Sequence, residues 1–227
     1  MENSRQARNL MFRNRLENVL QRLQNISHDE KSDEVSIPLY LHKNFLVRKV
    51  FIDRFKIAYN MTSFANKSVL DYGCGSGIFL ESISSEIKKG FGVDLDIEIA
   101  KKVTTSEKIS LTQIMNHDEI NKFSEINVIT SFDVLEHVAE LDSLLTIFSK
   151  ILSDDGEVII SGPTENAFYT FARKLARIGI QGNLRGSEEH VRNIFDIKNK
   201  MQEMGFLIQK DINLWSLFHV MSFKIKR

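Results

Sequence analysis

Cysteine is almost absent from this chain of 227 residues, since Cys74 is its only one. A single thiol excludes an internal disulfide and a cysteine-cluster metal site, and the cytoplasm is therefore the expected location. An excess of either charge is lacking as well, because thirty Lys and Arg balance thirty Asp and Glu. Proteins that bind nucleic acid in general carry a basic surplus, so no nucleic-acid partner is expected.

Proline and glycine are scarce, with two and eleven residues respectively, which argues against a loop-rich or disordered chain. No apolar run approaches the roughly 18–20 residues that a membrane-spanning helix needs, and the first residues lack the apolar core of a secretory signal. The 42% of hydrophobic residues can supply a large buried core. The length fits one α/β domain with additions.

The first 65 residues are predicted to form a helical extension. Apolar residues recur at spacings of three and four, which places them on one helix face: Phe12, Leu16, Val19, Leu20, Leu23 and Ile26. A second helix is predicted from about 41 to 59. The first helix also carries several arginines, namely Arg5, Arg8, Arg13, Arg15 and Arg22. We interpret them as a solvated face on a helix that packs against the main domain, with a contact to a partner or an acidic surface as the alternative.

From residue 66 onward, β-prone runs alternate with helical spacings. Seven strands are predicted, at 68–71, 90–94, 109–115, 127–130, 157–161, 207–212 and 218–225. Strands that alternate with helices indicate an α/β fold, with a mostly parallel sheet covered by helices on both faces. Only about five residues separate the last two strands, and a parallel crossover needs roughly a dozen, so the last strand is predicted to be antiparallel.

The segment Val69-Leu70-Asp71-Tyr72-Gly73-Cys74-Gly75-Ser76-Gly77 joins a strand to a helix through a glycine-rich turn. Glycines permit positive φ and let the backbone approach a ligand closely. No Gly-Lys-Ser/Thr follows, which excludes a phosphate loop, and Ile78 stands where a dinucleotide fingerprint needs glycine. Asp94 ends the next strand, 17 residues after Gly77, where a carboxylate can bind the two hydroxyls of a ribose. These residues indicate a nucleoside cofactor without choosing its kind.

The motifs VLDYGCGSG, FGVDLD, SFDVLEHV and LSDDGEVIISGPT, in this order and spacing, resemble those of class I S-adenosylmethionine-dependent methyltransferases. The likeness is greatest to the branch that includes quinone-biosynthesis methyltransferases and relatives acting on small molecules and glycans. It covers residues 66–227, which are predicted to be the methyltransferase domain. It implies a Rossmann-like, seven-stranded sheet and S-adenosyl-L-methionine as the cofactor.

The resemblance also implies roles for single residues. The loop around the amino-acid part of the cofactor would be formed by Asp71, Gly73, Gly75 and Gly77. Asp94 would hold the ribose, and Leu95 would lie beside the adenine. The remaining cofactor contacts would be Asp118 near the adenine amino group and Ser131 and Phe132 at the end of the fourth strand.

The chain departs from the family pattern at two places. Asn127 stands where the fourth strand often begins with aspartate, a departure expected to alter the edge of the site slightly. Asp154-Asp155-Gly156 replaces the usual Pro-Gly-Gly-like turn and should be tolerated as a surface turn.

Two histidines are candidates for a catalytic base, His137 and His190. A base is needed only where the accepting group holds a proton at neutral pH, and histidine has a suitable pKa for this task. Each histidine has a structural alternative: His137 as a helix-start residue bonded to backbone, and His190 as an exposed loop residue beside two glutamates. No histidine–carboxylate cluster has metal-ligand spacing, so no metal is expected.

The insert at 164–190 has an apolar stripe with basic residues and is interpreted either as a helix packed on the core or as a lid over the acceptor. Contact with an acidic lipid surface is a weaker alternative. The predicted activity is methyl transfer to oxygen of a small-molecule, lipid-like or glycan acceptor. Two other hypotheses stay open: a non-catalytic module that binds cofactor or a partner, and a nicotinamide-dependent oxidoreductase, which Ile78 disfavours. The sequence does not specify the oligomeric state.

Overall fold

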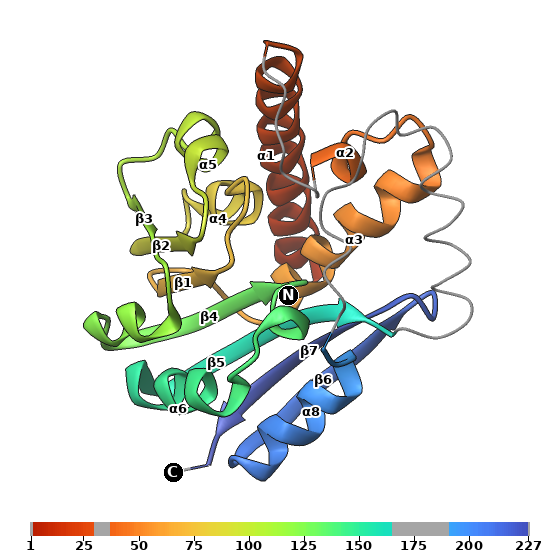
Figure 1. Ribbon diagram of the computed structural model, residues 1–227. Helices are drawn as coiled ribbons and strands as arrows, with labels where there is room; N and C mark the ends of the chain where they lie inside the picture. Colours follow the sequence, from red (N-terminus) through yellow and green to blue (C-terminus); the bar gives the residue numbers. More distant parts are fainter. Residues whose placement is uncertain (1, 30–36, 165–190, 227) are drawn as a thin grey trace. The chain divides into compact units, whose positions relative to one another are not determined.

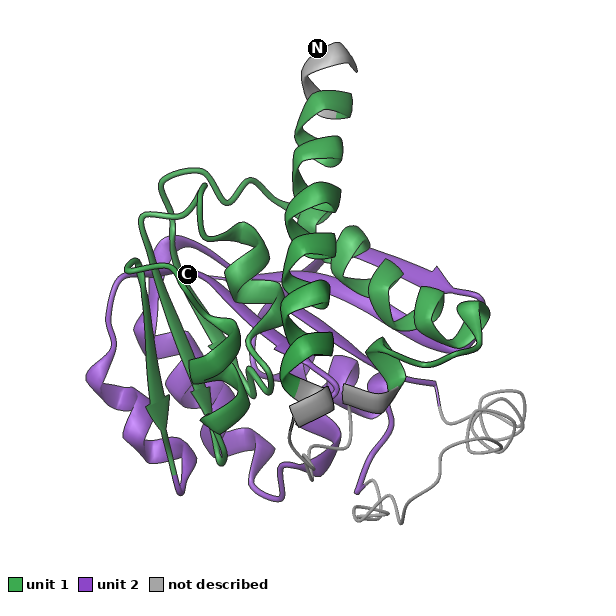
Figure 2. Ribbon diagram, turned by 90° about the horizontal axis from the view of Figure 1, so that it is seen from above, with its two compact units in different colours: residues 1–114 green, residues 115–227 purple. Residues whose placement is uncertain are grey.

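The computed structural model describes residues 2–29, 37–164 and 191–226 (Figure 1). Its seven strands follow the order β3-β2-β1-β4-β5-β7-β6, with β7 antiparallel to both of its neighbours. This confirms the predicted α/β fold with a mostly parallel sheet and an antiparallel last strand. The chain divides into two compact units, residues 1–114 and 115–227 (Figure 2), which are described separately.

Over residues 2–29 and 37–114, the first unit has three parallel strands and five helices. The strands are β1 (Ser68–Tyr72), β2 (Lys89–Asp94) and β3 (Ile109–Gln113). The helices are α1 (Glu2–Asp29), α2 (Ile37–Tyr40), α3 (Phe45–Met61), α4 (Ile78–Ile83) and α5 (Glu98–Val103). In the register of β1 and β2, Asp71 pairs with Gly92 and Tyr72 with Val93. The parallel strands therefore end together, which brings the glycine loop after β1 next to Asp94 at the end of β2.

Helix α3 begins at Phe45, four residues later than the apolar spacing predicts. The physical reason is a cap, because the side-chain oxygen of Asn44 accepts a hydrogen bond from the backbone N–H of Leu46 at 2.9 Å. A side chain that satisfies a free N–H of the first turn fixes where a helix starts. The predicted boundary at residue 65 falls between α3 and β1 and stays a prediction.

An aromatic cluster joins α1 and α3 to α4. The ring of Phe12 stacks on Tyr59 with 4.0 Å between centroids, and Phe79 lies edge-on to Phe12 and Phe64. These rings are buried, as are Leu16, Val19 and Leu23 on the same face of α1. The apolar stripe predicted for the first helix is thus confirmed, and it forms part of the core of this unit.

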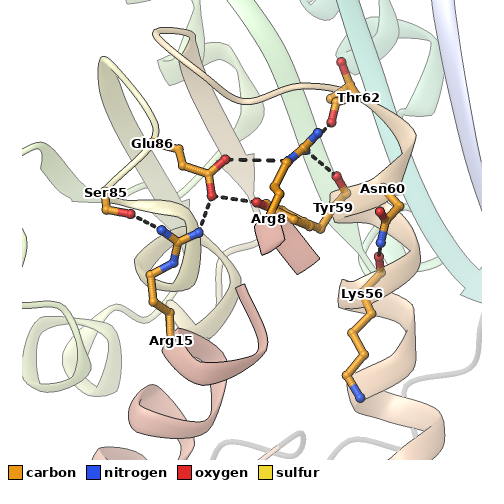
Figure 3. Close-up of polar contacts among 8 residues, drawn as sticks. All are labelled: Arg8, Arg15, Lys56, Tyr59, Asn60, Thr62, Ser85 and Glu86. Carbon is orange, nitrogen blue, oxygen red and sulfur yellow. Dashed lines mark hydrogen bonds and ion pairs between the residues drawn. The ribbon is translucent and has the colours of Figure 1, made fainter. Parts of the chain in front are cut away.

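Several arginines of α1 are partly buried and paired with residues of other elements rather than fully solvated, contrary to the main expectation. Arg15 pairs with Glu86, and one guanidinium nitrogen of Arg8 donates to the carbonyl oxygens of Tyr59 at 2.9 Å and Thr62 at 2.7 Å (Figure 3). Arg22 pairs with Glu81 at 3.0 Å. Arg8, Arg15 and Arg22 recur every seven residues, so they share the helix face that meets the core. Arg13 is exposed, as predicted.

In its described residues, 115–164 and 191–226, the second unit has four strands, two α-helices and two 3-10 helices. The strands are β4 (Ile126–Phe132), β5 (Leu152–Pro163), β6 (Phe206–Leu214) and β7 (Phe218–Ile225). The helices are η1 (His117–Lys122), η2 (Leu135–His137), α6 (Leu141–Ile151) and α8 (Ile194–Glu203). Phe132 pairs with Ser161 in the parallel β4–β5 register, and Pro163 pairs with Phe218 in the antiparallel β5–β7 register.

Strand β5 starts five residues earlier than predicted. The segment 154–156, which was expected to be a surface turn before the strand, lies within β5 at a place where its pairing with β4 changes register. The register jumps from Ile126↔Leu152 to Val128↔Glu157. A Cβ on Gly156 would lie 2.7 Å from Leu152 Cδ2 and 2.9 Å from the Ser153 carbonyl oxygen, so only glycine fits there. The amide of Asn127 donates to Ser153 Oγ at 3.1 Å, which ties the start of β4 to this irregularity.

Strands β6 and β7 form a hairpin whose turn contains Trp215 and Ser216. Both residues have positive φ, 54° and 57°, as the tight turns of twisted hairpins require. The N–H of Leu217 closes the turn onto the Leu214 carbonyl at 3.0 Å. The antiparallel pairing predicted from the short connection is confirmed.

Candidate functional site

The loop after β1 is shaped by three glycines in the left-handed region. Gly73, Gly75 and Gly77 have φ of 73°, 49° and 73°. Other residue types rarely adopt such φ values, because their Cβ clashes with the backbone. The N–H groups of Gly73 and Cys74 both donate to the Val93 carbonyl, at 2.8 and 3.1 Å, and the Gly77 N–H donates to the Cys74 carbonyl. The loop therefore turns sharply and stays attached to β2.

Asp94 is joined to this loop by a direct hydrogen bond. Its Oδ2 accepts the N–H of Gly75 at 2.7 Å, and its Oδ1 accepts the N–H of Asp96 at 3.3 Å. A carboxylate offers about four acceptor positions, so further hydroxyl groups can still donate to it. Next to it, Leu95 is 65% exposed. An oriented carboxylate beside an exposed apolar side chain suits the ribose and base of a nucleoside.

Three further residues belong to this loop or to the strand end before it. Asp71 is buried on β1, two residues before Gly73. Burial, together with the negative charge of Asp94, raises the pKa of the Tyr72 hydroxyl to about 12, so this phenol stays protonated at neutral pH. Cys74 is buried inside the loop, in agreement with a packing role.

Gly77 is required for two independent reasons. It is the N-cap of α4, with a left-handed backbone. In addition, a Cβ at this position would lie 3.1 Å from Thr104 Oγ1 and 3.4 Å from the Cβ of Ala100. Helix α4 thus leaves the loop in close contact with the end of α5.

In the second unit, the end of β4 carries Ser131 and Phe132. Ser131 is completely buried, and its hydroxyl has no hydrogen-bond partner among the described residues. Buried polar atoms are nearly always bonded, so an exception calls for an explanation, and a ligand atom is one. Phe132 is partly buried. The buried hydroxyl of Ser131, unpaired within the described residues, is therefore consistent with the expected contact to the cofactor.

Asp133 is a functional candidate that sequence reasoning missed. It follows β4 directly and has φ of 57°, which is unusual for a residue other than glycine. Its N–H donates to the Ser161 carbonyl at 3.0 Å, and Ser161 Oγ donates to its carboxylate at 3.2 Å. Its place right after a strand of the parallel sheet was the available signal, since ligands bind beyond the carboxyl ends of such strands.

His137 closes the short helix η2 and is exposed, whereas Glu136 before it is buried. The N–H of Val191 donates to the Glu136 carbonyl at 3.0 Å, and Arg192 donates to the carbonyls of Val138 and, at 3.2 Å, Ala139. The chain after the insert is therefore fastened to the segment around His137. His190 and the insert itself, residues 165–190, lie outside the described residues.

Asp118 lies in the first turn of η1 and is exposed. Asn116 caps this turn, because its side chain accepts the N–H of Asp118 at 3.0 Å, and Glu119 bonds back to the N–H of Asn116. The carboxylate of Asp118 is thus at a capped helix start on the surface, and its contact with adenine stays a prediction. Within residues 2–29, 37–164 and 191–226, no group of three or more His, Cys, Asp or Glu is arranged to hold a metal ion.

Comparisons with known proteins agree with this geometry. The sequence profile of a family described as a methyltransferase domain matches residues 42–210. A ubiquinone biosynthesis O-methyltransferase of Vibrio atlanticus is 33% identical over 155 residues, which are 61% of this chain and 65% of that protein. The enzyme of the same name from Dechloromonas aromatica is 28% identical over 58% of this chain and 60% of its own length. The chain thus spans less than two thirds of these relatives.

Solved structures show the same fold at low sequence identity. The N-methyltransferase NodS of Bradyrhizobium japonicum, in complex with S-adenosyl-L-homocysteine, has a TM-score of 0.62 with 14% identity, over 91% of this chain and 99% of its own. A protein from Listeria monocytogenes that is described as an S-adenosylmethionine-dependent methyltransferase has a TM-score of 0.61 with 18% identity, over 78% of this chain and all of its own.

Proposed function

We propose that this chain, which belongs to the methyltransferase domain family, binds S-adenosylmethionine and transfers its methyl group to an oxygen atom of a small molecule. The observation that carries this proposal is the loop of Gly73, Gly75 and Gly77, all at positive φ, with Asp94 bonded to Gly75. Such a loop lets main-chain atoms approach a ligand, while the carboxylate orients it.

The residues of the first unit fit the cofactor by their chemistry. The glycine loop with Asp71 would hold the amino-acid part, Asp94 has acceptor positions left for ribose hydroxyls, and exposed Leu95 offers an apolar contact to the base. Asp118, Ser131 and Phe132 are proposed as further cofactor contacts, and the buried Ser131 hydroxyl supports this role.

The bound cofactor supplies an activated methyl group on a sulfonium, so the protein has to orient the acceptor rather than create an electrophile. Orientation of this kind accounts for roughly 7–11 kcal/mol of a barrier in favourable cases. His137 and His190 are proposed to accept the proton of a hydroxyl acceptor. The exposure of His137 supports this, because a base has to reach its substrate.

The acceptor class rests on relatives. The proteins from Vibrio atlanticus and Dechloromonas aromatica carry the name ubiquinone biosynthesis O-methyltransferase, which favours an acceptor with a hydroxyl group. A lipid-like acceptor is proposed beside a small molecule, and a glycan is a further class for screening. A cytoplasmic location is proposed from the single cysteine. None of the described helices has the length and apolar character to cross a membrane.

Calorimetric titration with S-adenosylmethionine, and with NAD in parallel, tests the cofactor. Binding of the first alone is expected, with a dissociation constant in the micromolar range. In Asp94→Asn the affinity should fall about 10- to 100-fold, because a hydrogen bond to a charged group contributes roughly 1.5–3 kcal/mol. Asp96→Asn is the control, since Asp96 Oδ1 accepts the N–H of Glu98 at the start of α5 and Asp96 is not assigned to the cofactor. Binding of NAD, or of neither ligand, would refute the proposal.

Turnover is a separate question from binding. Incubation with S-adenosylmethionine and a panel of catechols, other phenols and glycans should yield S-adenosylhomocysteine with the phenols. A protein that binds the cofactor but yields no product with any acceptor would be the non-catalytic module instead.

A further inference from the structure

We propose that α1 is a positioning element of the cofactor loop and acts through Arg22 and Glu81, an inference that rests on the proposed function of that loop. The family match begins at residue 42, so it leaves α1 (Glu2–Asp29) without an assigned role. The helix is nevertheless in contact with α4 and α5, the two helices that border the loop.

The first step concerns α4, which has little stability of its own. It comprises only six residues, and its N-cap, Gly77, provides no side-chain hydrogen bond. Short helices are marginal in water, because nucleation fixes several residues for one hydrogen bond. The orientation in which α4 leaves the glycine loop must therefore come from tertiary contacts.

The second step concerns Glu81, which supplies those contacts. Its N–H donates to the Gly77 carbonyl at 3.0 Å, so it lies one turn from the loop. Its carboxylate is buried, 6% exposed, and accepts hydrogen bonds from Arg22 at 3.0 Å and from the Thr105 hydroxyl at 2.7 Å on Oε1. Arg22 also donates to Thr105 Oγ1 at 2.6 Å. Three segments, α1, α4 and the end of α5, thus meet at one carboxylate.

The third step links this cluster back to Gly77. Thr104, the residue before Thr105, has its hydroxyl 3.1 Å from the position of a Cβ on Gly77. A shift of the 104–106 segment would therefore change the packing on the loop as well as the bonds to Glu81. Because Arg22 bridges Glu81 and Thr105, it holds both sides of this contact.

A second group of contacts fixes α1 along its length. Glu86, shortly after α4, pairs with Arg15 and with Arg8 at 3.8 Å, and it accepts the Tyr59 hydroxyl at 2.6 Å (Figure 3). Helix α1 is thus attached at both ends of the α4 region, with Phe12 and Leu16 buried between. This attachment keeps Arg22 in place without help from the loop.

The variant Arg22→Ala tests the proposal. Its dissociation constant for S-adenosylhomocysteine, titrated well below the melting temperature, should rise about tenfold, within the range of roughly 5- to 150-fold typical of coupled sites. Arg13→Ala is the matched control, because Arg13 is on the same helix but exposed. Arg22→Lys keeps the charge but cannot bridge Glu81 and Thr105 with one planar group, so an intermediate constant is expected.

Hydrogen exchange provides a readout that a merely structural role would not change. Coupling is reciprocal, so saturation with S-adenosylhomocysteine should slow amide exchange in α1 around Arg22 more than in α8. This extra protection should disappear in Arg22→Ala.

A folded Arg22→Ala with the wild-type dissociation constant would overturn the inference, even if its melting temperature is lower. If Arg22→Ala does not fold, a wild-type constant in Arg22→Lys would overturn it equally. Absence of binding in the wild-type protein would instead remove the proposed function.

Discussion

The functional groups at the end of β1 come mainly from the backbone, and those at the end of β4 come mainly from side chains. After β1, the left-handed backbone of Gly73, Gly75 and Gly77 shapes the loop, and main-chain N–H groups make its bonds. After β4, side chains dominate: the hydroxyl of Ser131 and the carboxylate of Asp133, with His137 close behind in the chain.

This difference explains how visible each region is in a sequence. At the positions where a loop needs positive φ, glycine is strongly favoured. The glycines therefore recur at a fixed spacing that is visible in the sequence. A site built from side chains accepts several residue types, and its members become recognisable only when their burial and partners are known. We therefore expect the loop after β1 to act mainly on cofactor affinity. From the segment after β4 we expect a smaller contribution to cofactor affinity through Ser131 and the main effect on turnover through His137.

The largest effect should come from the second region. In His137→Ala, kcat should fall by about 100- to 10,000-fold, the usual contribution of a general base, while the cofactor dissociation constant stays unchanged. The same measurements apply to His190→Ala, because the sequence analysis makes His190 the second candidate base. Steady-state kinetics and calorimetry separate the two quantities. Unchanged turnover in both variants would remove histidine base catalysis and with it the proposed division of roles.

Unlike His137→Ala, which should lower kcat, Gly77→Ala should mainly weaken cofactor binding. The new Cβ meets Thr104 Oγ1 at 3.1 Å, and the left-handed backbone costs roughly 1–2 kcal/mol. The dissociation constant should rise by at least about tenfold, which corresponds to some 1.4 kcal/mol. Gly205→Ala is the control, because Gly205 has φ of 87° but no atom within 4 Å of the Cβ position. Equal loss of cofactor affinity in both variants would contradict a specific role of the loop.

Ser131→Ala should separate stability from binding. Its hydroxyl is buried without a partner in the described part of the chain, so its removal should leave the free energy of unfolding unchanged or higher. The cofactor affinity should fall by roughly 0.5–1.5 kcal/mol, the net value of one hydrogen bond. Thermal melts with and without S-adenosylhomocysteine measure both effects. A clear loss of stability without ligand would show that the hydroxyl serves the fold.

The smallest effect concerns stability of the second unit alone. Burial raises the pKa of Asp211, but hydrogen bonds from His219 and Lys198 outweigh burial and lower it overall. A lowered carboxyl pKa adds stability above the unfolded pKa of about 3.9, and this is lost as the pH falls below it. Asp211→Asn should therefore lower the free energy of unfolding by up to about 1 kcal/mol at pH 7.

Melting curves of both proteins should converge only when the pH has fallen below the lowered pKa of Asp211 in the folded protein, since only then is the carboxyl protonated in both states of the wild-type protein. Asp142→Asn, at a more exposed carboxylate, should change little at any pH. A difference for Asp211→Asn that persists at low pH would mean that the charge is not responsible.

The sequence by itself determined the local features. The glycine spacing predicts the loop, the alternation of strands and helices predicts the sheet, and a short connection predicts the antiparallel β7. Each of these depends on backbone limits that act within a few residues, which is why one sequence suffices. The start of α3 was missed by four residues, because a single Asn44 cap outweighs the apolar spacing.

Only the tertiary structure decided which polar residues have partners. Arg22 and Glu81 are 59 residues apart in the chain, and nothing in either neighbourhood indicates the other. The same holds for Ser161 and Asp133, and for the partnerless hydroxyl of Ser131. Such contacts arise from the packing of distant elements, and burial, which gives them their energetic weight, is a property of the folded chain.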